Sequence, residues 1–148
     1  MSSTPFYESN DLIIRPYRSD DAASLAFYSN NKLIAAQMEP WFASPFTYDD
    51  ACCWVVENID GQNFPIIFYG DVIGNVGLRN AADGKAEIVV WLAPDFWGKG
   101  IAGRACNWIA EYAANQLSIK ALTAKIKSGN SAAIAIAEKL GISYTNWQ

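Results

Sequence analysis

The chain has 148 residues, of which 51% are apolar and 18% charged; this composition excludes a disordered protein and fits one globular domain over residues 1–148. Its net charge of −4 argues against a nucleic-acid binder, and no apolar run approaches the roughly 20 residues that span a bilayer. The first residues lack the basic and apolar segments of a signal peptide, so we expect a cytoplasmic protein that binds neither nucleic acid nor membrane.

Residues that usually hold metals or form disulfides are scarce. The sequence has no histidine, and its three cysteines, Cys52, Cys53 and Cys106, form no C-x-x-C pair. An odd number of cysteines without that spacing indicates neither a disulfide framework nor a zinc site. We therefore expect structural thiols and no bound metal.

The first part of the chain predicts one strand and two helices. Residues 12–16 are rich in branched side chains and end on a proline, which indicates a strand. Residues 19–30 begin with an N-cap serine, and residues 47–57 begin with a capping-box pattern, so both are predicted helices. Residues 40–46 are too aromatic for an ordinary surface loop and either line a pocket or pack in the core.

The second part of the chain begins with three predicted strands, at about 64–69, 71–78 and 85–92. The connections between them are so short that neighbouring strands must be antiparallel. The later predicted elements are a helix over 102–117, a strand over 119–126, a helix from Asn130 or Ser131 to just before Gly141, and a strand over 142–147.

The predicted order of elements is therefore β-α-α-β-β-β-α-β-α-β. The first strands are antiparallel, whereas the crossover helix makes strands 85–92 and 119–126 parallel. The predicted fold class is α/β (α+β), with a mixed, mostly antiparallel central sheet that carries helices on both sides.

A glycine-rich segment, residues 98–103, lies between strand 85–92 and the next helix. Its three glycines leave backbone N–H groups uncovered at the helix N-terminus, where a pyrophosphate would bind; a flexible turn without a ligand is the alternative. The segment matches G-x-G-x-x-G, but residues 94–97 separate it from the strand, and residues 121–127 contain no carboxylate. These departures exclude a dinucleotide-binding motif, and a Walker A string is absent.

Residues 86–102, A-E-I-V-V-W-L-A-P-D-F-W-G-K-G-I-A, resemble the GNAT acetyltransferases, and in particular their RimJ/RimL-like branch. The family pattern R/Q-x-x-G-x-G/A falls on Trp97, Gly100 and Ala102, and residues 130–142 resemble a later helix of the family. The resemblance extends from about residue 11. It implies a GNAT-like fold and an acetyl-CoA-dependent N-acetyltransferase, an acyltransferase that moves an acetyl group to a primary amine by direct attack.

The resemblance also implies a binding site for acetyl-CoA. Loop N–H groups would bind the pyrophosphate, and the end of strand 85–92 would pair with the pantetheine arm. The implied cofactor-binding residues are Trp91, Leu92, Trp97, Gly98, Lys99, Gly100, Ile101, Ala102, Gly103 and Asn130. Lys99, Arg104, Lys125 and Lys127 are candidates for contacts with the 3′-phosphate.

Glu87 is the candidate general base. In strand 85–92 both sets of alternating side chains are mostly apolar, so we expect both faces to be covered. A carboxylate in such surroundings suits the removal of a proton from an amine, and the resemblance implies the same role. The alternative is a structural Glu87 paired with a lysine or arginine. The positions where the family often places a catalytic tyrosine or serine are occupied by Ala137 and Ala133.

These alanines support a second hypothesis, a catalytically degenerate CoA-binding or regulatory module. A third is a structural or partner-binding domain that uses the aromatic residues 41–48. The chain also has a shortened C-terminus relative to the family, so we expect the edge of strand 142–147 to pair in a homodimer. The expected acceptor is a protein N-terminus or a small-molecule amine.

Overall fold

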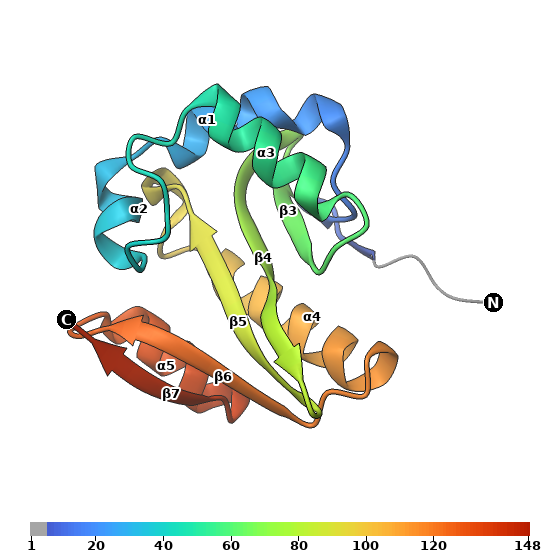
Figure 1. The fold of residues 1–148 in the computed structure, drawn as a ribbon, viewed down its shortest axis with the longest axis vertical. Helices are drawn as coiled ribbons and strands as arrows, with labels where there is room; N and C mark the ends of the chain where they lie inside the picture. Colours follow the sequence, from blue (N-terminus) through green and yellow to red (C-terminus); the bar gives the residue numbers. More distant parts are fainter. Residues whose placement is uncertain (1–5) are drawn as a thin grey trace.

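The computed structural model describes residues 6–148 as a central sheet with helices on both of its faces (Figure 1). The strands are β1 (Tyr7–Glu8), β2 (Leu12–Ile14), β3 (Asn63–Phe68), β4 (Asp71–Ala82), β5 (Lys85–Leu92), β6 (Ala121–Lys127) and β7 (Ser143–Trp147). The α-helices are α1 (Ala22–Ser29), α2 (Lys32–Gln37), α3 (Tyr48–Asn58), α4 (Ile101–Gln116) and α5 (Ser131–Leu140). Two 3-10 turns, η1 (Ser19–Asp21) and η2 (Pro94–Phe96), precede α1 and α4.

The predicted order of elements is confirmed, and the structure adds two short ones. β1 pairs with β2, and α2 follows α1 after an N-cap in which the side chain of Asn31 accepts a hydrogen bond from the Leu33 N–H at 2.8 Å. Both elements are too short to produce a recognisable period in the sequence.

The strands lie in the sheet in the order in which they occur in the chain, from β1 to β7. All pairs from β1 to β5 are antiparallel, whereas β5–β6 and β6–β7 are parallel. Each parallel pair is joined by a crossover helix, α4 for the first and α5 for the second. The sheet is therefore mixed and mostly antiparallel, as the sequence predicts.

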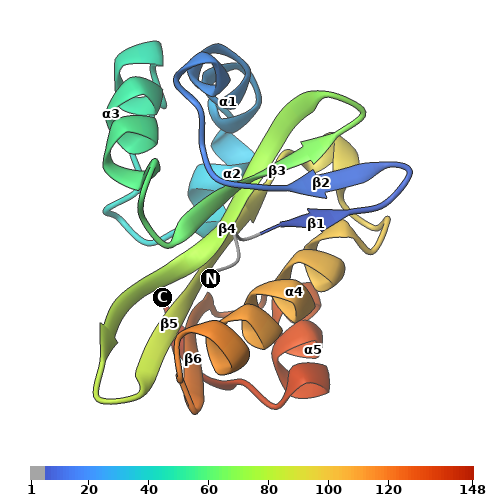
Figure 2. The ribbon, with the colours of Figure 1, turned by 90° about the vertical axis from the view of Figure 1, so that its right-hand side faces the viewer.

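Two hydrophobic cores lie on opposite faces of this sheet. α4 and α5 cover one face, where Phe64 and Ile109 are among the buried side chains, and α1 and α3 cover the other, where Leu25 and Val55 are buried (Figure 2). β5 contributes alternate side chains to both cores. The expectation that strand 85–92 is covered on both faces is thus confirmed.

Candidate active site

The candidate site begins where β5 and β6 separate. Their parallel pairing covers only Lys85 to Glu87 of β5, opposite Ala121 to Thr123 of β6. Beyond that point β6 continues beside β7, whereas β5 continues beside β4, and Figure 1 shows the two strands diverging. We call the opening between them the fork. Residues 88–92 of β5 have no strand on this side within residues 6–148.

The backbone groups that β5 presents to the fork follow from its pairing with β4. The Ala93 N–H donates to Ile73 O at 2.9 Å, so the backbone of Ala93 points toward β4. Because the direction alternates from residue to residue, Trp91 also points toward β4, whereas Val90 and Leu92 point into the fork. The open edge predicted at Trp91 and Leu92 therefore belongs to Val90 and Leu92, and the backbone of Trp91 does not contribute to it.

The segment 98–103 lies at the end of this open edge and leads into α4. Gly98 and Gly100 have φ angles of 77° and 78°, in the left-handed region that favours glycine. The first hydrogen bond of α4 runs from the Arg104 N–H to Gly100 O, and Gly100 provides no side-chain cap. The N–H groups of residues 98–103 consequently have no acceptor within the described part of the chain.

The space over this segment is open. A Cβ atom added at Gly98, Gly100 or Gly103 would meet no atom within 4 Å. The uncovered N–H groups form a positive helix N-terminus that suits a phosphate group. We call residues 98–103 the N–H cradle. Trp97 lies beside it, and its indole N–H donates to the carbonyl of Leu92 at 2.7 Å, which ties the cradle to the end of β5.

Three further residues that the sequence predicts to bind the cofactor differ in their exposure and in their hydrogen bonds. Ile101 is buried, so only its backbone N–H faces the open space, and Lys99 is exposed. Asn130 caps α5, because its side-chain oxygen accepts from the Ala133 N–H at 3.2 Å. That cap lies beyond the end of β6, on the opposite arm of the fork from the cradle.

Glu87 lies at the base of the fork, with its side chain on the α1–α3 face of the sheet. Its side chain is only 10% exposed and has two cationic neighbours: Arg79 Nε lies 4.0 Å from one carboxylate oxygen, and Lys125 Nζ lies 3.6 Å from the other. Arg79 is the residue opposite Glu87 on β4, and Lys125 comes from β6 just after pairing ends. These contacts are those of the alternative considered for Glu87, a glutamate paired with a lysine and an arginine. The role of Glu87 as a general base stays a prediction.

A cavity of about 550 Å³, which we call the aromatic groove, lies on the same face of the sheet, and Glu87 is not one of its lining residues. Its walls are the C-terminal half of α2, the segment after it, and the ends of β6 and β7. Its lining includes Met38, Glu39, Trp41, Phe42, Lys127 and Trp147. Glu39 is connected to the fork, because its carboxylate lies 4.0 Å from Lys125 Nζ.

The aromatic residues within 40–46 both pack in the core and line a pocket, the two alternatives that the sequence leaves open. Phe42 and Phe46 are buried, and the ring of Phe42 lies 5.0 Å from that of Trp91 in an edge-to-face arrangement. Trp41 is 38% exposed in the groove and stacks on Trp54 of α3 at 6.1 Å. The side chain of Trp91 thus anchors the groove wall to β5, and this is its structural role in the site.

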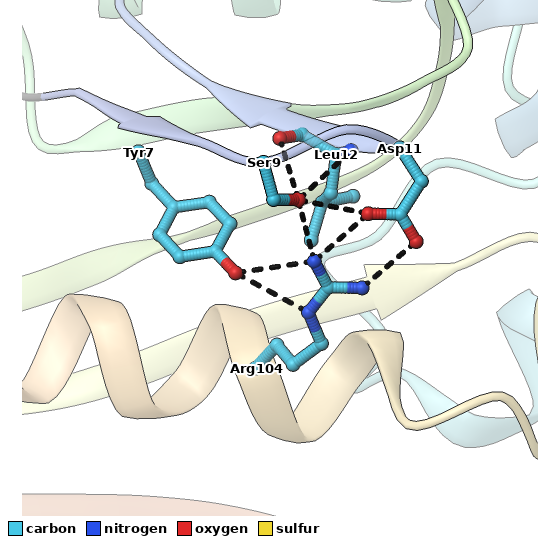
Figure 3. A network of polar contacts seen from close by, with 5 residues as sticks. All are labelled: Tyr7, Ser9, Asp11, Leu12 and Arg104. Carbon is cyan, nitrogen blue, oxygen red and sulfur yellow. Dashed lines mark hydrogen bonds and ion pairs between the residues drawn. The ribbon is translucent and has the colours of Figure 1, made fainter.

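Arg104, the candidate for a phosphate contact, is engaged elsewhere. Its guanidinium donates to both oxygens of Asp11, at 3.0 and 2.9 Å, to Ser9 Oγ at 2.7 Å and to the Tyr7 hydroxyl at 3.1 Å. Figure 3 shows this network joining α4 to the β1–β2 hairpin. The hydrogen bonds from Arg104 and then from Ser9 hold the pKa of Asp11 well below its usual range. Arg104 therefore fixes the start of α4 rather than facing the cradle.

Asp11→Asn is expected to destabilise the fold in a pH-dependent way. Because the pKa of Asp11 is lowered on folding, its pairing stabilises the fold above the usual aspartate pKa of about 3.9. This stabilisation is lost as the pH falls below that value. The free energy of unfolding, measured with urea, should be lower for the variant at neutral pH, and the difference should shrink below about pH 4. Asp60→Asn, an exposed control, should behave as wild type; a pH-independent difference for Asp11→Asn would contradict the assignment.

The sequence did not predict that Arg79 and Glu39 belong to the site. It also did not predict that Lys125 lies next to Glu87. Arg79 could have been identified from the sequence, since the register of the β4–β5 hairpin places it opposite Glu87. Glu39 and Lys125 come from distant segments whose approach depends on the tertiary fold.

The described helices include none that is both long and apolar enough to cross a membrane.

Residues 11–143 match the family model of the acetyltransferase (GNAT) domain. The chain is 30% identical over 86 residues to YdaF of Bacillus subtilis (strain 168), a match that covers 57% of this chain but only 47% of that protein.

Two further matches extend over most of the chain. It is 27% identical over 136 residues to the spermidine N(1)-acetyltransferase of Escherichia coli (strain K12), covering 88% of this chain and 72% of that enzyme. The crystal structure of ribosomal-protein-S5-alanine acetyltransferase from Vibrio fischeri superimposes with a TM-score of 0.81 at 20% identity, covering 92% of this chain and 81% of that one. This likeness confirms the fold.

Proposed function

Because the chain belongs to the GNAT acetyltransferase family, we propose that it transfers the acetyl group of acetyl-CoA to a primary amine. The observation that carries this proposal is the placement of three features at one fork: the N–H cradle, the open edge of β5 and Glu87. They supply an anion site, a backbone pairing edge and a proton acceptor in one continuous region. Two of the matched relatives are named as amine or protein acetyltransferases, which supports the same chemistry.

The residues present fit a CoA-type cofactor. Uncovered N–H groups and open space over Gly98, Gly100 and Gly103 suit the pyrophosphate. The backbone of Val90 and the N–H of Leu92 are offered to an extended arm lying in the fork, as a further strand would pair there, while the Leu92 carbonyl already accepts from Trp97. The side chain of Lys99, within the cradle, is exposed and would contact a further phosphate. When bound, the cofactor supplies the activated acetyl group.

Glu87 would remove the proton from the acceptor amine. Amines of the lysine type are protonated in neutral water, with a pKa of about 10.4, so attack requires a base. The amine would enter from the aromatic groove, where Trp41 and Phe42 provide apolar walls. Backbone N–H groups of β5 that point into the fork, such as that of Val90, would stabilise negative charge on the thioester oxygen. No covalent enzyme intermediate is needed.

A second candidate function is a CoA-binding module without turnover. Ala133 and Ala137 pack against the core from α5 and carry no hydroxyl that could protonate a leaving thiolate. The two functions are separated by measuring CoA binding calorimetrically and, in parallel, thiol release from acetyl-CoA over a panel of amines that includes peptide N-termini and polyamines. Turnover with any amine supports the enzyme, binding without turnover supports the module, and absence of binding contradicts both.

We also propose a homodimer that pairs through β7. β7 pairs with β6 on one side, and within residues 6–148 no strand covers its other edge. The Trp147 carbonyl accepts from the Ser128 N–H at 2.8 Å, so Trp147 points toward β6, and by alternation Asn146 points outward. An exposed edge of this kind favours two-fold pairing.

Asn146→Pro should therefore convert the dimer to a monomer without unfolding the chain. Proline removes an outward N–H and leaves the β6–β7 ladder intact. Light scattering at micromolar concentration should report half the wild-type mass, with an unchanged circular dichroism spectrum. The matched substitution Asn146→Ala keeps the N–H and should remain dimeric. A wild-type monomer, or a dimeric Asn146→Pro variant, would exclude pairing at this edge.

A further inference from the structure

The amine of Lys125 occupies an unusual position in the candidate site. Lys125 lies on β6, two residues after Thr123, the last residue that pairs with β5, so it projects over the fork. Its Nζ atom lies 3.6 Å from a carboxylate oxygen of Glu87 and 4.0 Å from a carboxylate oxygen of Glu39. A primary amine is thus already in contact with the proposed general base.

No other described lysine has such surroundings. Among the residues that the structure describes, Lys125 is the one lysine that lies within ion-pair distance of a carboxylate. Lys127, the next lysine on this face, is directed away: its Nζ lies 4.4 Å from the centroid of the Trp147 ring. The side chain of Lys125 is 50% exposed, so it is not locked in place, whereas that of Glu87 is 10% exposed.

We propose that Lys125 is itself an acetyl acceptor, so that the protein acetylates its own Lys125 from acetyl-CoA. This inference rests on the proposed function, because it requires the acetyl group to be delivered into the fork. It goes beyond that function by assigning a modification site within the chain. The flexible four-carbon stem of a lysine allows Nζ to leave Glu87 and approach a group that lies in the fork.

The transfer to Lys125 conserves atoms and charge. Glu87 accepts one proton from the Lys125 ammonium, which leaves a neutral amine with a free electron pair. That pair forms the new N–C bond to the acetyl carbonyl carbon, the C–S bond breaks, and its electron pair leaves with sulfur. The nitrogen then loses a second proton, which neutralises the thiolate. The products are an N-acetyl lysine, free CoA and the proton carried by Glu87, which passes to solvent.

Acetylation would remove the positive charge that lies between Glu87 and Glu39. An acetamide can donate one hydrogen bond but cannot pair with two carboxylates. Glu39, on the wall of the aromatic groove, would then be free to bind a cationic amine. The modification would therefore change the charge of the groove in which we place the acceptor.

The experiment incubates the full chain with acetyl-CoA and follows each lysine by peptide mass spectrometry. Lys125 should gain one acetyl group about 10²-fold faster than the exposed Lys139 on α5, the size of effect expected from a positioned general base. Glu87→Gln should remove this difference, and Lys125→Arg should abolish the fast-labelled site. Lys139→Arg is the matched control and should leave labelling of Lys125 unchanged. CoA binding and thiol release with the amine panel are measured on the same samples.

Two outcomes overturn the inference while leaving the proposed function intact. In one, panel amines are acetylated but Lys125 is not. In the other, Lys125 and Lys139 are acetylated at equal rates in both wild type and Glu87→Gln, which would mean that the acetylation is uncatalysed. Absence of both CoA binding and any acetylation would instead reject the proposed function, and the inference with it.

Discussion

Gly100→Asp is expected to weaken the binding of CoA by well over tenfold, which corresponds to about 1.4 kcal/mol or more. The substitution places a negative charge in the open space over the N–H cradle, where the pyrophosphate should bind. It also places a side chain at a residue whose φ is 78°. Calorimetry with CoA measures the affinity, and circular dichroism confirms that the variant is folded.

Two matched variants separate the causes of this loss. Gly84→Asp introduces the same charge at a residue with a similar φ of 76°, in the β4–β5 turn at the opposite end of β5, and should bind CoA as wild type does. Gly100→Asn keeps the size of the side chain without its charge and should lose less affinity than Gly100→Asp. If a folded Gly100→Asp protein binds CoA with unchanged affinity, the cradle does not bind the pyrophosphate.

Glu87→Gln is expected to lower kcat by about 10²-fold or more while leaving the affinity for CoA near the wild-type value. Glutamine keeps the shape of the side chain but cannot accept a proton from the amine. Glu87 lies at the base of the fork, whereas the cradle lies at the other end of the open edge, so the two functions should separate. Steady-state thiol release and calorimetry measure them independently.

The control for this variant is Glu138→Gln, a change of the same chemistry at an exposed position on α5. It should retain wild-type kcat. Arg79→Gln tests the neighbouring cation, which lies 4.0 Å from the Glu87 carboxylate, and should alter the pH profile of kcat without abolishing turnover. A Glu87→Gln protein with wild-type kcat and an unchanged pH profile would leave Glu87 a structural partner of Arg79 and Lys125.

Most of the fold was predictable because its signals are local. Alternation and short turns identify the β3–β4–β5 meander, and capping residues identify α3 and α5. The predicted end of β4 at residue 78 was too early, since the strand continues to Ala82. Its pairing with β5 is irregular between Arg79 and Ala82, so alternation is lost where the strand is still present.

The site was predictable to the extent that it lies within one continuous segment. Glu87 and residues 98–103 follow one another along β5, η2 and α4, so their placement at the two ends of one open edge follows from the chain itself. The contacts of Lys125 with Glu87 and Glu39 join three segments that are remote in sequence. The engagement of Arg104 by Asp11 is likewise a long-range contact, which is why the sequence pointed to a phosphate ligand instead.

The most direct test of the central claim is an amide NMR titration of the wild-type protein with CoA. The N–H groups of residues 98–103 have no acceptor in the described structure, so binding of a pyrophosphate should give them new hydrogen bonds. The largest chemical-shift changes are predicted in these residues and at Val90 and Leu92 on the open edge of β5. Saturable binding that leaves residues 98–103 unchanged, or no binding at millimolar CoA, would contradict the account.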